Sequence, residues 1–356
     1  MKLEEVLSLP KFRGTFVERI NRFVVKANLD GQEVYAYLPN PGKLLELLIP
    51  GETLILTENK PNEKTPNKLP YLVLAVLKEG EPVLLHTHLT NRIIAKLIEE
   101  RKVPLFSEYR VLSFEPSFQG ARFDLLLEKE GLKTLVEVKT CTLFNDNLAM
   151  FPDAVSLRGT KHLLSLAQAK ELGYHPLCLF VVMSKKPVYF LPAFHIDLAF
   201  TQAFLTVKDK VELRAISISA DENLENFSFV KELEIPFERL EGLVKDSGVY
   251  LLVLEVKGQV EVEVGALGKI QFKPGFYVYV GSAKANLQKR IDRHKRKNKI
   301  LKWHIDYLTS AARIVGEFPI RSEKISECEL AGAVKSLCDG EIPKFGSSDC
   351  NCQSHL

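Results

Sequence analysis

The sequence predicts a multidomain protein in which a β-rich N-terminal domain precedes an α/β domain and a C-terminal α+β domain. The 356 residues exceed what one hydrophobic core usually supports. Short apolar runs cut by turn dipeptides fill residues 12–85, and strand and helix patterns alternate after residue 90. A new strand begins at Gly248, after a polar, acidic segment at 219–228 and a charged segment at 237–247. We therefore expect a domain boundary in this region, near residue 240.

The composition is that of an ordinary globular protein. Apolar residues make up 46% of the chain and charged residues 26%, which excludes wholesale disorder. No stretch approaches the roughly 20 consecutive apolar residues that a membrane span needs, and the first five residues carry acids where a signal peptide is apolar. We expect a cytoplasmic protein that does not enter a membrane. The net charge of +3 does not by itself indicate nucleic acid binding, so the distribution of charge has to carry that argument.

Residues 12–85 predict a small antiparallel barrel or sandwich. Apolar and polar residues alternate in short runs, for example at 22–27 and 33–38. Such runs, separated by turn signals, are typical of short strands in a compact β domain. The turn dipeptides between the runs are Asp30-Gly31, Pro41-Gly42 and Pro50-Gly51.

The middle of the chain predicts an α/β core. A helix is expected at 91–101, where apolar residues have the spacing of one buried face. Strands are expected at 123–127 and 134–138, followed by a helix at 161–172 and an apolar strand at 177–183. Strands that alternate with helices in this order are typical of an α/β domain.

The two strands at 123–127 and 134–138 predict a β-hairpin with Glu130-Gly131 at its tip. Glycine supplies the positive φ that a two-residue turn demands. Pairing outward from the tip then sets the register of the hairpin. The expected pairs are Glu128 with Lys133, Leu126 with Leu135, Asp124 with Glu137, and Arg122 with Lys139.

This register would gather two acids and two cations on one face of the hairpin, because side chains alternate across a strand. Like charges directly opposite one another destabilise a sheet, so Asp124 and Glu137 would need a cation between them. Carboxylate oxygens suit Mg²⁺ or Mn²⁺, and Lys139 could orient or deprotonate a water for attack on phosphorus. The alternative, which stays open here, is that Glu137 and Lys139 line the solvent side of a half-buried strand.

The acidic hairpin resembles the signature of the PD-(D/E)XK nucleases. Asp124 takes the place of the first acid, and Glu137-Val138-Lys139 takes the place of the second part. Over residues 12–235 the chain more closely resembles the sugar fermentation stimulation protein family. The matching stretches are Pro39-Asn40-Pro41-Gly42-Lys43, Arg122-Phe123-Asp124, Val136-Glu137-Val138-Lys139-Thr140, Met150-Phe151-Pro152-Asp153-Ala154 and Arg158-Gly159-Thr160-Lys161-His162-Leu163.

The resemblance implies an OB-like β-barrel at 1–86, a PD-(D/E)XK nuclease-like α/β domain at 87–238, and DNA binding with little sequence preference. Three polar residues open the helix after the acidic hairpin, where a phosphate could meet both their side chains and the helix N-terminus. Helix capping and surface charge are their alternative roles. In this domain, nucleic acid contacts are expected of Arg122, Arg158, Lys161 and His162.

Two short C-terminal segments together resemble the halves of a GIY-YIG nuclease motif. The halves are Gly248-Val249-Tyr250 and Tyr279-Val280-Gly281, and the long interval between them suggests an inserted hairpin at about 260–272. The segment 345–356 matches a small GIY-YIG-like family of uncharacterised function. The resemblance implies a GIY-YIG-like α+β domain at 243–356.

The same pattern implies a second catalytic centre. It expects an arginine on the helix at 286–294, which Arg290 supplies, and a later helical glutamate. Glu327 fits the glutamate best, with Glu329 as the competing choice. A tyrosine would take a proton from water, the arginine would neutralise the phosphate, and the glutamate would hold a divalent metal. We expect Tyr250, Tyr279, Arg290 and Glu327 to line one shallow surface.

One dense positive stripe lies between Lys284 and Lys302, where nine Lys and Arg residues face a single acid, Asp292. A solvated charged helix is the usual explanation for such a run, but the position beside Tyr279 and Arg290 favours phosphate contact. The residues of the stripe expected to contact nucleic acid are Lys289, Arg293, His294 and Lys297.

The six cysteines do not indicate a disulfide framework, because two stand alone and four crowd the last stretch of the chain. Reduced thiols are expected. Thiols and an imidazole near the C-terminus could bind zinc, but their spacing departs from the paired Cys-x-x-Cys pattern, and buried free cysteines are frequent. Zinc is therefore not expected as a cofactor. The residues concerned are Cys350, Cys352 and His355, with Cys328 or Cys338.

Three hypotheses for function follow. The first is a Mg²⁺- or Mn²⁺-dependent nuclease that hydrolyses DNA phosphodiester bonds and has two potential centres. The second is a non-cleaving, sequence-nonspecific DNA-binding or regulatory protein. Asp124, Glu137 and Lys139 together favour the enzyme, because a pure binder does not need opposed carboxylates that repel DNA. Action on RNA is the third, since OB-like barrels also bind RNA.

Overall fold

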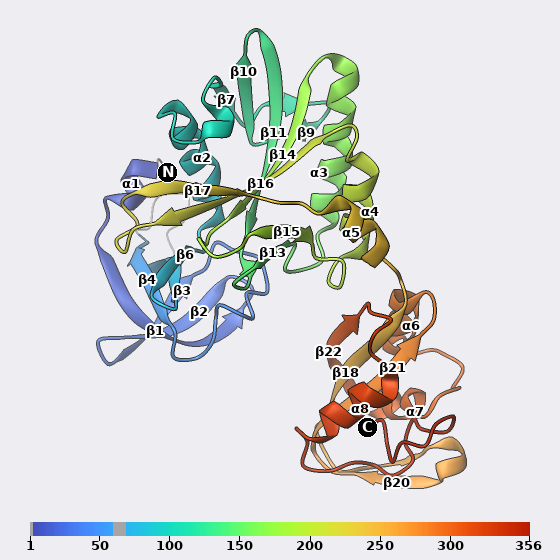
Figure 1. The fold of residues 1–356 in the computed structure, drawn as a ribbon. Coiled ribbons are helices and arrows are strands. Elements are labelled where there is room, and N and C mark those ends of the chain that lie inside the picture. Colours follow the sequence, from blue (N-terminus) through green and yellow to red (C-terminus); the bar gives the residue numbers. More distant parts are fainter. Residues whose placement is uncertain (1–2, 60–68) are drawn as a thin grey trace. The chain divides into compact units, whose positions relative to one another are not determined.

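The computed structural model describes residues 3–59 and 69–356, which form two compact units. The first unit extends to residue 193 and continues over 199–237, and the second comprises 194–198 and 238–356 (Figure 1). Each unit has its own sheets and its own buried apolar residues.

Five strands of the first unit close into a barrel. The strand order is β3-β2-β1-β4-β5-β6, and a further parallel pairing of β3 with β5 joins the two ends of the first five strands. The other pairings are antiparallel, which confirms a small antiparallel barrel in this region. The elements are α1 (Leu3–Leu7), β1 (Lys11–Asn21), β2 (Val24–Leu29), β3 (Gln32–Tyr37), β4 (Thr53–Glu58), β5 (Tyr71–Lys78) and β6 (Glu81–Leu84).

The rest of the first unit is an α/β domain around a sheet of order β17-β16-β14-β11-β10-β7. Strands β11, β14 and β16 are parallel, and the flanking pairings are antiparallel. The helices are α2 (Thr90–Glu99), α3 (Leu157–Gln168) and α4 (Leu198–Val207), with 3₁₀ turns η1 (Thr87–Leu89), η2 (Pro104–Phe106) and η3 (Ala169–Leu172). The main strands are β7 (Arg110–Phe114), β10 (Leu125–Lys129), β11 (Leu132–Cys141), β14 (His175–Val182), β16 (Glu212–Ala220) and β17 (Phe227–Leu233). Shorter strands are β8 (Ser117–Phe118), β9 (Ala121–Arg122), β12 (Leu143–Phe144), β13 (Leu148–Phe151) and β15 (Tyr189–Pro192).

Strand β11 is covered by helices on both faces. Thr140 donates to the hydroxyl oxygen of Thr90 in α2 (2.8 Å), whereas Glu137 contacts His162 in α3 (2.8 Å). Residues an odd number of positions apart point to opposite faces of a strand, so α2 and α3 lie on opposite sides of β11. The middle of the strand, 134–138, is accordingly buried throughout.

Helix α3 begins earlier than the apolar spacing predicts. Ser156 precedes the helix, and its hydroxyl accepts the N–H of Gly159 (3.0 Å), which satisfies one of the free donors of the first turn. The helix therefore includes the whole segment 157–160, and it ends at Gln168, where a 3₁₀ turn follows. The early start places Arg158 and Lys161 on the exposed first turns.

Two of the motifs that carry the family resemblance meet between the barrel and the α/β domain. The N–H of Leu44 donates to the Asp153 carboxylate (3.3 Å), and a Cβ on Gly42 would lie 2.1 Å from Asp153 Oδ2. Only glycine lets the backbone approach the carboxylate this closely. On the other side of the loop, the Arg19 guanidinium donates to the carbonyls of Gly42 (2.6 Å) and Lys43 (2.7 Å). These motifs therefore hold the barrel against the α/β domain.

The second unit is an α+β domain around an antiparallel sheet of order β21-β18-β22. Strands β19 and β20 form the expected hairpin at 260–272, which lies between β18 and β21 in the chain. The elements are α5 (Phe237–Leu243), β18 (Gly248–Val256), β19 (Val260–Glu263), η4 (Gly265–Leu267), β20 (Lys269–Phe272), β21 (Gly275–Ala283), α6 (Leu287–Lys295), α7 (His304–Ala311), β22 (Arg313–Ile320) and α8 (Glu327–Lys335). Among the residues described, no helix combines the length and apolar character needed to cross a membrane.

Candidate functional site

The first acid of the candidate site, Asp124, lies immediately before β10, where regular pairing with β11 ends. Its N–H donates to the carbonyl of Val136 (3.0 Å), and its Oδ2 accepts the N–H of Val138 (2.7 Å). The expected direct pair of Asp124 with Glu137 is therefore wrong, because the aspartate side chain replaces a strand hydrogen bond, a competition typical of this residue type. The expected pairs Glu128 with Lys133 and Leu126 with Leu135 are confirmed, and the ladder ends at Leu125 with Val136.

The expected pairing of Arg122 with Lys139 is also wrong. Arg122 belongs to β9 and pairs with Ser117 of β8. Its side chain is 66% exposed and forms an ion pair with Glu115 (3.2 Å). The turn between β8 and β9 takes Arg122 out of the hairpin register, so its contact with nucleic acid stays a prediction.

The second acid, Glu137, is buried in the middle of β11. Its Oε1 accepts hydrogen bonds from Lys139 Nζ (2.6 Å) and from His162 Nδ1 (2.8 Å). Its Oε2 is buried and has no hydrogen-bond partner among the residues described. The alternative in which Glu137 and Lys139 line a solvent-facing strand is therefore wrong, since both side chains are largely enclosed.

His162 links this acid to the basic start of α3. Arg158 Nε donates toward His162 Nε2 (3.4 Å), and Nδ1 of the same ring faces Glu137. The network places a proton on Nδ1 of His162, which donates it in a hydrogen bond to Glu137. His162 thus positions the carboxylate, a role that its place in the sequence did not indicate. Asn91 of α2 was missed entirely, although its amide donates to Asp124 Oδ1 (2.6 Å).

The two carboxyl groups have opposite pKa shifts. Burial, followed by the negative charge of Glu137, raises the pKa of Asp124 to about 6. Burial also acts to raise the pKa of Glu137, but the hydrogen bonds and charges of His162 and Lys139 outweigh it and lower that pKa. Burial acts to lower the pKa of the Lys139 ammonium, but the charge and hydrogen bond of Glu137, together with smaller contributions from Cys178 and Asp124, outweigh it and raise that pKa. Lys139 is therefore a cation here.

This donor set fits a divalent cation. Glu137 Oε2 is free to coordinate, and each oxygen of Asp124 accepts one hydrogen bond and retains a further lone pair. Carboxylate oxygens suit Mg²⁺, Mn²⁺ or Ca²⁺, and such an ion would relieve the repulsion from Glu137 that, after burial, contributes to the raised pKa of Asp124.

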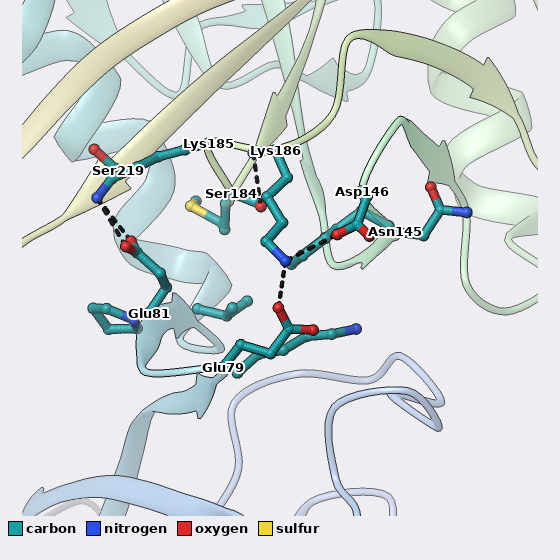
Figure 2. Close-up of a pocket in the computed structure, with 13 residues that line it drawn as sticks. Glu79, Glu81, Asn145, Asp146, Ser184, Lys185, Lys186 and Ser219 are labelled. Carbon is teal, nitrogen blue, oxygen red and sulfur yellow. Dashed lines mark hydrogen bonds and ion pairs between the residues drawn. The ribbon is translucent and has the colours of Figure 1, made fainter.

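A cavity elsewhere in the first unit lies beside the β5–β6 hairpin and has a volume of about 390 Å³. Figure 2 shows Lys186 reaching from one wall toward Glu79 and Asp146, and the ion pair of Lys185 with Glu81 (2.8 Å) closes another side. Acids already neutralise these lysines, and the cavity shares no residue with the pair of acids in β10 and β11. These lysines are therefore not free to bind a phosphate.

In the second unit, the two halves of the tyrosine motif lie side by side. Strands β18 and β21 pair Tyr250 with Gly281, and a Cβ on this glycine would lie 2.4 Å from the Tyr250 ring. Tyr250 and Tyr279 are only 2% and 6% exposed, with ring centroids 6.3 Å apart. The expected shallow surface is therefore wrong for both tyrosines, because β18 and β21 direct their rings into the core of the unit.

Other polar groups surround Tyr250. Its hydroxyl is 2.8 Å from Nε2 of His294, and the charges of Arg290 and Glu327 both act on it. Burial raises the pKa of Tyr250 far above its ordinary value and lowers the pKa of His294 to about 4. At neutral pH the hydroxyl is therefore protonated and the imidazole neutral. Arg290 lies over the ring of Trp303, with its guanidinium carbon 4.8 Å from the ring centroid.

The expected DNA contact of His294 is wrong, whereas that of Arg293 stays a prediction although its charge is engaged within the unit. His294 is 1% exposed, because Tyr250 and Asp306 enclose its ring. Arg293 donates to both carboxylate oxygens of Asp306 (3.0 and 3.1 Å), so its charge is neutralised within the unit. Lys289 and Lys297 are exposed, and their contact with nucleic acid stays a prediction.

Glu327, the expected ligand of a second metal, is already engaged. Its Oε2 accepts the hydroxyl of Ser282, and its Oε1 faces Nδ1 of His355 (2.9 Å). The competing Glu329 caps α8 instead, since it accepts from the N–H and the hydroxyl of Ser326 (2.8 and 2.7 Å). The structure thus favours Glu327 as the glutamate that lies near Tyr250.

Comparison with known proteins divides the chain into three segments. Residues 17–88 match the family described as SfsA N-terminal OB domain, and residues 88–224 match the Sugar fermentation stimulation protein RE domain. Residues 249–356 match the Domain of unknown function DUF123. The OB domain corresponds to the closed barrel, and the second match covers β11 and α3 with the acidic site.

Several relatives resemble a large part of the chain. A sugar fermentation stimulation protein homolog of Methanothermobacter thermautotrophicus is 39% identical over 191 residues, which are 54% of this chain and 78% of that protein. A homolog of Clostridium kluyveri is 36% identical over 214 residues, which are 59% of this chain and 91% of that protein. A solved structure of Pyrococcus furiosus SfsA in complex with Ca²⁺ is 26% identical with a TM-score of 0.58, and the match covers 64% of this chain and 96% of that one.

Proposed function

The chain belongs to the sugar fermentation stimulation protein family, and we propose that it is a DNA-binding nuclease whose Asp124 and Glu137 hold a divalent cation. One observation carries the proposal. The half-buried Asp124 carboxylate accepts the N–H of Val138, the residue next to the buried Glu137, and Glu137 Oε2 has no partner among the described residues. The complex of Pyrococcus furiosus SfsA with Ca²⁺ supports a divalent-metal site, because that protein matches the first unit's size and fold.

The residues around the two acids have separate tasks. When bound, the cation would supply Lewis-acid activation of the phosphodiester and of a water. Asp124 and Glu137 would hold it, while His162 and Asn91 keep the two carboxylates in place. Because the pKa of Lys139 is raised, its ammonium would stabilise negative charge on phosphate rather than remove a proton from water.

Binding to the DNA backbone would involve the exposed start of α3. Arg158 and Lys161 lie on its first turns, where the free N–H groups of the helix also favour an anion. These groups recognise phosphate and carry no base information, so we propose binding with little sequence preference. Mg²⁺ or Mn²⁺ is the proposed physiological ion, because both are hard cations that suit carboxylate ligands.

For the second unit, DNA binding is better supported than cleavage. Its tyrosines are buried, and Glu327 is held by Ser282 and His355, whereas Lys289 and Lys297 are exposed. A second centre formed by Tyr250, Tyr279, Arg290 and Glu327 stays a prediction.

Cleavage assays on labelled single-stranded DNA, duplex DNA and RNA test the proposal directly. We expect the full-length protein to cut DNA with Mg²⁺ or Mn²⁺ and to stop cutting in EDTA. DNA binding without cleavage under all metal conditions would establish the non-cleaving alternative. Cleavage of RNA alone would show that the substrate class is wrong.

The exposed lysines of the second unit give a separate prediction about binding. The double variant Lys289→Ala/Lys297→Ala should weaken affinity about equally for unrelated duplexes, because phosphate contacts are independent of sequence. Each lost contact removes roughly 0.9 from the slope of log affinity against log salt, so the slope should fall by about 1.8.

Titrations at several salt concentrations measure both quantities for these two lysines. The matched control is Lys257→Ala/Lys324→Ala, which removes the same charge from exposed positions outside the stripe. An unchanged slope in the first variant, or an equal change in both, would show that the stripe does not contact the backbone.

A further inference from the structure

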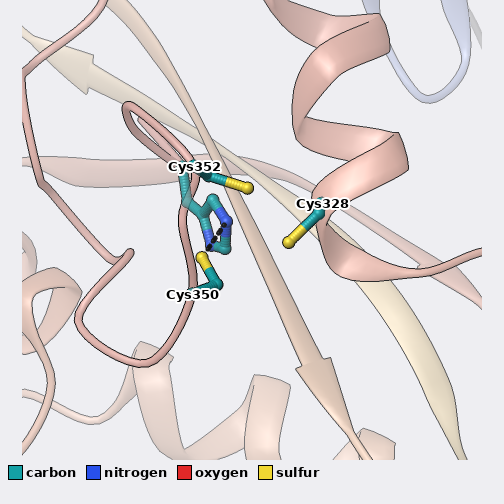
Figure 3. Close-up of side chains that lie close together, drawn as sticks. Cys328, Cys350 and Cys352 are labelled. Carbon is teal, nitrogen blue, oxygen red and sulfur yellow. Dashed lines mark hydrogen bonds between the residues drawn. The ribbon is translucent and has the colours of Figure 1, made fainter.

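Three thiols and an imidazole from two distant segments meet in the second unit. Cys328 lies in the first turn of α8, whereas Cys350, Cys352 and His355 belong to the C-terminal tail. Their sulfur and nitrogen atoms all lie within 4.8 Å of one another. Figure 3 shows the three thiols converging from the helix and from the tail. Cys338, the other cysteine near the C-terminus, is not part of this cluster.

The dimensions of the cluster are close to those of a tetrahedral metal site. In a zinc site with Zn–S near 2.3 Å and Zn–N near 2.0–2.1 Å, neighbouring ligand atoms lie roughly 3.4–3.8 Å apart. Cys350 Sγ and His355 Nε2 are already 3.4 Å apart. The widest separation is at most 4.8 Å, so rotation of the cysteine side chains, without a backbone shift, would complete the tetrahedron.

His355 is oriented as a metal-binding histidine. Its Nδ1 faces Glu327 Oε1 (2.9 Å), and its Nε2 points to the thiols. A carboxylate on the second ring nitrogen fixes the tautomer and raises the basicity of the coordinating nitrogen. The backbone of His355 is also fixed, because its N–H donates to Phe345 (2.8 Å) and its carbonyl accepts from Val280 (2.8 Å).

A disulfide explains this geometry less well than a metal. One disulfide would use two thiols. It would leave the closeness of the third thiol and of the His355 ring unexplained. Four ligands from Cys and His, with no position left open, are the set that closed structural zinc sites use. Soft thiolates with tetrahedral geometry also favour zinc over Mg²⁺ or Ca²⁺.

We propose that Cys328, Cys350, Cys352 and His355 bind a structural zinc ion that fastens the C-terminal tail to α8. The ion would also position Glu327, because this carboxylate hydrogen-bonds the ring that holds the metal. The site lies entirely in the second unit, so it does not depend on the acids of the first unit or on nuclease activity.

Metal analysis of the full-length protein, purified under reducing conditions, tests the site. We expect about one zinc ion per chain, removable by a strong chelator and restored by added zinc. Cys350→Ser and Cys352→Ser should each lose the ion, whereas the matched variant Cys338→Ser should retain it. Less than a tenth of the expected zinc after reconstitution, or retention of zinc in both ligand variants, would overturn the proposal. A thiol count that reveals a disulfide in the reduced protein would do the same.

Two further variants separate metal binding from simple folding. His355→Cys offers a fourth thiolate and should retain zinc, while His355→Ala should lose it. Glu327→Ala removes only the partner of the imidazole, and the loss of such a partner typically weakens zinc binding about 10–100-fold. Equal zinc affinity in Glu327→Ala and wild type would show that the carboxylate does not support the site.

The single tryptophan, Trp303, lies in the same unit and reports on its folding. Chelation should lower the midpoint of unfolding followed by Trp303 fluorescence in wild type and in Cys338→Ser. The same treatment should leave Cys350→Ser unchanged. A chelator effect of equal size in all three proteins would contradict a site at these ligands.

Discussion

Replacing either Asp124 or Glu137 with alanine is expected to lower metal-dependent DNA cleavage by about a thousandfold. A bound cation stabilises transition-state charge by several kcal/mol, and about 4 kcal/mol corresponds to three powers of ten in rate. Each variant removes one of the two carboxylates that would hold the ion. The measurement is the initial rate of cleavage by the full-length protein at saturating Mg²⁺ or Mn²⁺.

The matched control for these variants is Glu99→Ala, which removes an exposed acid from α2 and should cleave at the wild-type rate. Calorimetric titration with Ca²⁺ gives an independent readout, because loss of a ligand should abolish binding even where cleavage is slow. Thermal unfolding checks that each variant is folded. Full cleavage by either folded variant would rule out the acid pair as the catalytic centre.

The two acids illustrate how far the sequence could predict the candidate site. Glu130 and Gly131 have φ of 49° and 83°, so the hairpin tip was correctly located and the register was correct up to Leu125 and Val136. Beyond that point the Asp124 carboxylate accepts the N–H of Val138. The alternation of side chains along a strand does not predict this hydrogen bond. The prediction that the two acids share one site agrees with the structure, but the prediction that they pair directly across the hairpin is wrong.

Residues contributed by other elements could not be predicted from spacing. Asn91 and His162 are far from the hairpin in sequence, and only the placement of α2 and α3 on opposite faces of β11 brings them to the acids. The proposed zinc ligands could not be predicted from spacing either, because they meet only where the C-terminal tail returns to α8. Pairwise spacing within one segment carries no information about such contacts.

The basic stripe shows why a charge count misjudges surface residues. Arg293 and Lys289 are both cations on α6, yet Arg293 is bound to an aspartate on the next helix while Lys289 is exposed. Asp306 lies outside the stripe in sequence, so the charge balance of the stripe does not include it. A buried acid on a neighbouring helix therefore decides which cations remain available for phosphate.

Replacing Asp306 with alanine is expected to destabilise the second unit strongly. Asp306 is fully buried and accepts from Arg293 and from the N–H groups of Lys302 and Trp303 (3.0 and 3.1 Å). Its carboxylate also lies 3.5 Å from Lys299 Nζ. Alanine would leave these cations and donors without their partner inside the unit. Removal of one member of a buried pair costs about 3–5 kcal/mol, so Asp306→Ala should lose that much unfolding free energy.

Denaturant unfolding followed by Trp303 fluorescence and by circular dichroism measures this loss. The matched control is Asp292→Ala, which removes an exposed acid of α6 and should change stability by less than about 0.5 kcal/mol.

The stabilisation that Asp306 provides also depends on pH. Burial acts to raise the pKa of Asp306, but the Lys302 and Trp303 N–H groups and Arg293 outweigh it and lower that pKa. The stabilisation is therefore present above the pKa of unfolded aspartate and is lost as pH falls through the lower folded value. If Asp306→Ala and Asp292→Ala were equally stable at neutral pH, the contacts of Asp306 would not stabilise the packing of α6 on α7.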